Sequence, residues 1–121
     1  MPSSTSRSST CRTQYAAQAD DFCVTTRWVL TEVANALSKS ISRGDVATFL
    51  GGLEDDPNVR IAGDSDALYR SGLALYKARS DKHWSLTDCI SFVVMEQEGL
   101  REALTRDRHF EQAGFVAVFA E

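Results

Sequence analysis

Short β-prone runs alternate along this chain with longer segments in which apolar residues recur at helical spacing. The short runs predict strands at residues 22–26, 59–62, 103–105 and 115–119. The longer segments predict helices at residues 27–42, 45–53, 65–79 and 85–98. Because strands and helices alternate, the pattern predicts an α/β layer fold with a mainly parallel sheet. Such sheets bind ligands beyond the carboxyl ends of their strands.

The two ends of the chain differ in character. Residues 1–14 are rich in Ser and Thr and lack apolar periodicity, which predicts a disordered tail. Residues 15–121 carry all the periodic segments and are expected to form one domain. Within it, residues 90–95 are apolar on nearly every side of the predicted helix, so neighbours should bury that helix on more than one face.

Net charge and cysteine content limit the kinds of partner and the cellular compartment to be expected. The net charge of −4 argues against broad, charge-driven binding to nucleic acid, although a local basic rim around an acidic site remains open. The 3 cysteines include no C-x-x-C pair, so they predict neither a zinc site nor a disulfide framework. There is no apolar segment of the roughly 18 residues that a membrane span needs, and no signal peptide pattern. The expected location is therefore the cytoplasm.

Three carboxylates interrupt apolar or small-residue contexts. Glu32 lies at the shoulder of an apolar helical face, where it either points to a site or simply reaches water. Asp88 opens the buried helix, but Ser85-x-x-Asp88 also fits a capping box. Asp107 follows the strand at 103–105, and it would serve equally as a turn residue or helix N-cap. If such carboxylates converge, they need a cation, and Mg²⁺ or Mn²⁺ prefers oxygen ligands.

Three motifs together resemble the PIN-domain proteins. They are TTRWVLTEV at residues 25–33, WSLTDCISF at 84–92, and ALTRDRHF at 103–110 followed by Gly114-Phe115. Their order and spacing agree with that family over residues 15–119. The resemblance implies a three-layer fold with a mainly parallel central sheet flanked by helices. It also implies a Mg²⁺- or Mn²⁺-dependent ribonuclease, in many members the VapC-type toxin that an antitoxin holds inactive.

The resemblance assigns roles to individual residues. Glu32 matches the second acidic position of the family, Asp88 the third and Asp107 the fourth, so all three are expected to bind metal and act in catalysis. Thr105 matches a polar position beside the fourth acid and would orient a ligand or water. The expected partners are an RNA substrate, an antitoxin and a second copy of the chain.

One part of the family pattern has no counterpart in this chain. PIN domains open with an apolar strand that ends in Asp followed by Thr or Ser, and neither Asp20 nor Asp21 follows such a strand. The domain is therefore expected to be incomplete at its N-terminus, either because translation starts upstream of Met1 or because the copy has degenerated. The alternative function is a catalytically impaired remnant that acts only as a protein-interaction module.

Basic residues beside the motifs have two interpretations. Four of them could contact phosphate or could be ordinary solvated charges: Arg27, Lys82, Arg106 and Arg108. A third class of function, a generic domain for small anionic ligands, lacks a phosphate-binding loop, because Gly51-Gly52 interrupts a helix instead of following a strand.

Overall fold

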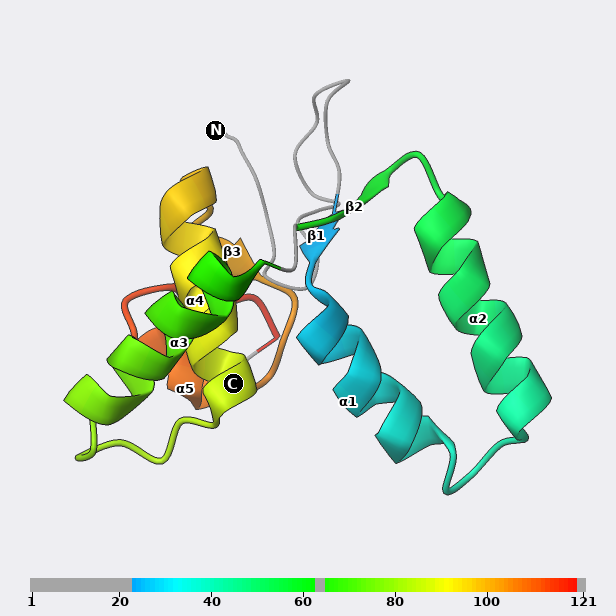
Figure 1. The fold of residues 1–121 in the computed structure, drawn as a ribbon, viewed down its shortest axis with the longest axis horizontal. Helices are drawn as coiled ribbons and strands as arrows, with labels where there is room; N and C mark the ends of the chain where they lie inside the picture. Colours follow the sequence, from blue (N-terminus) through cyan, green and yellow to red (C-terminus); the bar gives the residue numbers. More distant parts are fainter. Residues whose placement is uncertain (1–22, 63–64, 120–121) are drawn as a thin grey trace.

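The computed structural model describes residues 23–62 and 65–119 (Figure 1). The strands are β1 (Cys23–Thr25), β2 (Val59–Ile61), β3 (Glu102–Ala103) and β4 (Val116–Ala117). The helices are α1 (Arg27–Leu37), α2 (Arg43–Asp55), α3 (Asp66–Ala78), α4 (Leu86–Glu98) and α5 (Arg108–Gln112). This alternation confirms the predicted α/β class.

The described strands pair in parallel, as predicted. β1 pairs with β2 in the register Cys23–Val59, and β3 pairs with β4 in the register Glu102–Val116. Within the described residues they form two separate pairs, each two or three residues long, instead of one continuous sheet. Parallel neighbours need a crossover connection, which α1 and α2 provide for the first pair and α5 for the second.

Helix α4 is the centre of the hydrophobic core, which confirms the prediction for residues 90–95. Its side chains Ile90, Phe92 and Met95 are buried, and α3 packs along it. Gly72 of α3 permits this close packing, because a Cβ atom there would lie 2.3 Å from Cγ1 of Ile90. The core therefore holds α3 and α4 together while it fixes the start of α4, where Asp88 lies.

Helices α1 and α2 form a hairpin that extends away from the group of α3, α4 and α5 (Figure 1). α1 ends at Leu37, earlier than predicted, and Ser38 is its C-cap; the N–H and the hydroxyl of Ser38 both donate to the carbonyl oxygen of Ala34, at 3.0 Å and 2.8 Å. Ser42 then caps α2 by accepting a bond from the N–H of Asp45. Gly44, which lies between the two predicted helices, is therefore inside α2.

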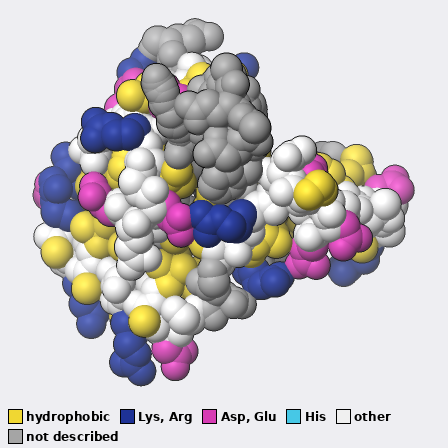
Figure 2. Space-filling view, turned by 90° about the horizontal axis from the view of Figure 1, so that it is seen from above, with side chains coloured by type: hydrophobic (Ala, Val, Ile, Leu, Met, Phe, Trp, Pro, Cys, Tyr) yellow, Lys and Arg dark blue, Asp and Glu magenta, His cyan; other side chains and the backbone are white. Residues whose placement is uncertain are grey.

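Charges of both signs are interspersed over the face seen from above in Figure 2, with hydrophobic side chains between them. Among the described residues in this view, Lys and Arg side chains do not gather into one broad basic patch. In the described residues, no helix is both long and apolar enough to span a membrane.

Two predictions concern residues that the structure does not describe, and a third concerns the cysteines. The predicted tail at residues 1–14 and the expected absence of a first strand lie outside the described residues. Among the cysteines, Cys89 is a buried free thiol, whereas Cys23 is disulfide-bonded, contrary to the expectation from spacing.

Candidate active site

The first turn of α4 positions Asp88. Ser85 is the N-cap, and its hydroxyl oxygen accepts a bond from the N–H of Asp88 at 3.0 Å. In return, the N–H of Ser85 donates to Oδ2 of Asp88 at 3.1 Å, which completes the capping box. The capping interpretation of this motif is therefore correct. It also means that the Asp88 carboxylate is held in one orientation at the start of the helix.

The first turn of α5 positions Asp107 in a similar way. Asp107 is the N-cap, and its Oδ1 accepts a bond from the N–H of His109 at 2.9 Å. The N–H of Asp107 donates to the hydroxyl oxygen of Thr105 at 3.0 Å. Thr105 thus restrains the loop that carries Asp107, and its predicted role in orienting a ligand or water stays a prediction.

His109 joins the two carboxylates. Its Nδ1 lies 3.2 Å from Oδ2 of Asp88 and 3.3 Å from Oδ1 of Asp107. One ligand-type atom from each of these three residues lies within 4.8 Å of the others. The side chains are 18% exposed for Asp88, 31% for His109 and 42% for Asp107, so solvent reaches the cluster. Two carboxylates and an imidazole, close together and accessible, can bind a divalent cation.

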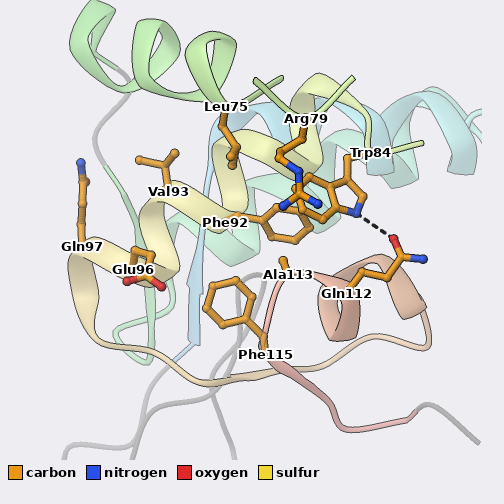
Figure 3. A pocket seen from close by; sticks show the side chains of 10 residues that line it. All are labelled: Leu75, Arg79, Trp84, Phe92, Val93, Glu96, Gln97, Gln112, Ala113 and Phe115. Carbon is orange, nitrogen blue, oxygen red and sulfur yellow. Dashed lines mark hydrogen bonds between the residues drawn. The ribbon is translucent and has the colours of Figure 1, made fainter. Parts of the chain in front are cut away.

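Aromatic packing holds α4 and α5 against each other. The indole Nε1 of Trp84 donates to Oε1 of Gln112 at 2.9 Å (Figure 3). Phe92 packs edge-on against both Trp84 and Phe110, with ring centroids 5.0 Å and 4.8 Å away. These contacts border a pocket of about 380 Å³, and Arg79 covers the Trp84 ring at 5.2 Å. The distance between Asp88 and Asp107 therefore depends on this aromatic group.

A family model for the PIN domain matches residues 4–116, almost the whole chain. The chain belongs to the PIN-domain family. Among solved structures, it is similar to the Mycobacterium tuberculosis toxin VapC20, described as cleaving the sarcin–ricin loop. That match has a TM-score of 0.72 and 25% sequence identity, and it covers 78% of this chain and 72% of the toxin. A search of curated proteins finds no match.

Within this PIN domain, two of the predicted acids lie together and one does not. Asp88 and Asp107 share the cluster, although 18 residues separate them in the sequence. Glu32 is exposed on α1, and its carboxylate is outside the group of atoms within 4.8 Å. Thr105 contacts the cluster through the backbone of Asp107. The group of possible metal ligands found in the described residues thus comes from the starts of α4 and α5.

His109 was not singled out from the sequence. The signal was present in the spacing Asp107-x-His109, because an N-cap and the second residue of its helix lie on the same end of one short helix. What the spacing could not show is that Asp88, from another helix, approaches the same imidazole.

The basic residues beside the motifs are mostly engaged with acids. Arg27 pairs with Glu54 at 2.6 Å and Arg108 with Glu111 at 2.7 Å. Lys82 lies 3.9 Å from Asp81, while Arg106 is exposed beside the Asp107 loop. These pairs favour the interpretation of solvated surface charges for Arg27 and Arg108.

Beside Asp88, the Cys89 thiol is held in its protonated form. Burial raises the pKa of Cys89, and the neighbouring negative charge of Asp88 raises it further. A protonated, buried thiol is a poor nucleophile and a poor metal ligand. Cys89 is therefore not a candidate nucleophile or metal ligand of this site.

Proposed function

We propose that this PIN domain is a metal-dependent endoribonuclease that hydrolyses RNA phosphodiester bonds, and that it acts as the toxin of a toxin–antitoxin pair. The observation that carries the proposal is the convergence of Asp88 and Asp107, the two motif acids from separate helices, on His109. Family membership and the likeness to a toxin that cleaves RNA support it.

The donor set fits a hard divalent cation. Asp88 and Asp107 together offer two negative charges in a partly exposed place, and carboxylate oxygens are the preferred ligands of Mg²⁺ and Mn²⁺. When bound, such an ion would neutralise phosphate charge and lower the pKa of water, which supplies a nucleophile near neutral pH. Asp88 and Asp107 are the residues proposed to hold it.

Hydrogen bonds within the chain fix these carboxylates before any ligand binds. The Ser85 N–H restrains Asp88, and the Asp107 N–H bond to Thr105 restrains the loop before α5. Because the side chains are already held, binding costs little further ordering, which favours precise placement of a phosphodiester. Glu32 is part of the proposed set by motif match alone, because its carboxylate is exposed on α1 and outside the cluster.

The proposed partners follow from the toxin likeness. The substrate would be a folded RNA, with the sarcin–ricin loop as the first sequence to test, because VapC20 cleaves that loop. An antitoxin would bind the toxin and block it. The cytoplasm is the proposed location, because both RNA and antitoxin are found there.

The test is cleavage of a labelled sarcin–ricin loop hairpin, and of an unrelated hairpin, by the full chain with Mn²⁺, with Mg²⁺ and with EDTA. Cleavage that EDTA abolishes and that Asp107→Asn and Asp88→Asn reduce would support the proposal. Asp45→Asn is the matched control, because Asp45 occupies the same helix position after Ser42 but lies far along the chain on α2. A folded chain without EDTA-sensitive cleavage of either RNA would reject it and favour an interaction module.

A further inference from the structure

His109 lies between two carboxylates that come from different helices. Its Nδ1 faces Oδ2 of Asp88 at 3.2 Å and Oδ1 of Asp107 at 3.3 Å. Both neighbours are acceptors, so Nδ1 satisfies them only when it carries a hydrogen. In that tautomer the Nδ1–H group donates to Oδ2 of Asp88, while the backbone N–H of His109 donates to Oδ1 of Asp107. Nδ1 then cannot itself bind a cation.

The hydrogen bonds divide the carboxylate oxygens into two kinds. Oδ2 of Asp88 also accepts from the Ser85 N–H, and Oδ1 of Asp107 also accepts from the His109 N–H. Oδ1 of Asp88 and Oδ2 of Asp107 accept no bond from the described part of the chain. Each carboxylate is therefore held by one oxygen and leaves its other oxygen available.

We propose that His109 is a positioning residue: it holds one oxygen of Asp88 and one of Asp107, so that the remaining oxygen of each is presented to the same divalent cation. Hydrogen bonds to metal-binding carboxylates fix their orientation, and losing such a partner typically lowers metal affinity about 10–100-fold. The inference rests on the proposed function only in naming the cation. Negatively charged carboxylates repel one another, so the three motif acids cannot hold each other in place. A hydrogen-bond donor such as His109 can.

A second property of the site fits this role. His109 spans α4 and α5, whereas the backbone bonds of Asp88 and Asp107 each stay within one helix end. Without the imidazole, the described hydrogen bonds fix each carboxylate separately and none fixes the two relative to each other. The conformational entropy lost in bringing the two carboxylates together would then reduce the affinity for the cation.

The experiment measures Mn²⁺ binding to the full chain by isothermal titration calorimetry, without RNA. The amide nitrogen of Asn can occupy the place of Nδ1, the amide of Gln is placed closer to Nε2, and Leu offers no donor. We expect His109→Asn to bind Mn²⁺ within about threefold of the unmodified chain and His109→Leu to bind at least about tenfold more weakly. His83→Leu is the control, because His83 is an exposed histidine outside the cluster.

Three outcomes would overturn the inference. One is equal Mn²⁺ affinity of His109→Leu and the unmodified chain, and another is a His109→Asn affinity as low as that of His109→Leu. The third is ¹⁴N coupling from His109 to bound Mn²⁺ in pulsed electron paramagnetic resonance, which would make it a direct ligand. If His109→Leu does not fold, the comparison of Asn with Gln decides, with Asn expected to bind more tightly. Failure of the unmodified chain to bind Mn²⁺ would reject the proposed function as well.

Discussion

Gly72 of α3 lies so close to Ile90 of α4 that a single added carbon would be 2.3 Å from Cγ1 and 3.1 Å from Cα of Ile90. The second contact is with backbone, which cannot rotate away. This pair sets the distance between the two helices at the centre of the core. Since α4 also carries Asp88, the packing of the core and the geometry of the site are linked through one helix.

We expect Gly72→Ala to lower the free energy of unfolding by about 1–3 kcal/mol, because overpacking forces the two helices apart. Gly51→Ala is the matched control. Gly51 is also inside a helix, but a Cβ atom there meets nothing within 4 Å, so Ala should stabilise by roughly 0.5–1 kcal/mol. Urea unfolding followed by circular dichroism measures both, and equal effects of the two changes would contradict the prediction.

The bond between Trp84 and Gln112 gives a second prediction. Gln112→Leu removes the acceptor of the buried indole N–H, which should cost about 1–3 kcal/mol of stability. Gln112→Glu keeps an oxygen at the same place and should lose less. This bond also holds α5 against the start of α4. Gln112→Leu should therefore weaken Mn²⁺ binding, although it changes none of the residues proposed to bind the ion. Thermal unfolding and calorimetry measure the two effects, and a Glu variant as unstable as Leu would argue against the bond.

The loop before α4 contains a carboxyl whose titration can be observed directly. The hydrogen bond from Arg79 lowers the pKa of Asp81 to about 2, from an ordinary value near 4. The folded value is the lower one, so any stability from this pair is present above about pH 4 and is lost as the pH falls toward 2. The pair is exposed, so the effect on unfolding should be small.

Carbon-detected nuclear magnetic resonance of the Asp81 carboxyl should therefore give a midpoint near 2. In Arg79→Gln the midpoint should rise toward the ordinary range. A midpoint unchanged by this substitution would show that Arg79 is not the cause.

Glu32 requires a separate test, because its role rests on the motif match. We expect Glu32→Gln to reduce RNA cleavage at least about tenfold while leaving the unfolding transition unchanged, since Glu32 is exposed. Glu54→Gln, an exposed acid on α2 that pairs with Arg27, is the control. Cleavage by Glu32→Gln at the level of the control would remove Glu32 from the proposed site.

Sequence patterns predicted the elements well where the physical signal is local. The apolar middle of α4, its Ser85-x-x-Asp88 cap and the N-cap at Asp107 depend on residues within one turn of each other. The predicted boundaries between α1 and α2 were wrong, because apolar spacing continues to Ile41 while the caps at Ser38 and Ser42 end one helix and begin the next. The meeting of Asp88 with His109 was not predictable, since it depends on how Phe92, Trp84 and Phe110 pack.

The two bonds of the Ser85–Asp88 capping box have a consequence for the fate of inactive copies of this protein. A residue with a catalytic role and no structural role can be replaced with little effect on folding. The inactive protein is then as stable in the cell as the active one. Here the same carboxylate also stabilises the start of the most buried helix. Replacing Asp88 by Ala removes the N3 half of the capping box, and a loss of about 1 kcal/mol raises the unfolded fraction roughly fivefold. We therefore expect Asp88→Ala chains to be degraded faster in the cell than Asp107→Asn chains.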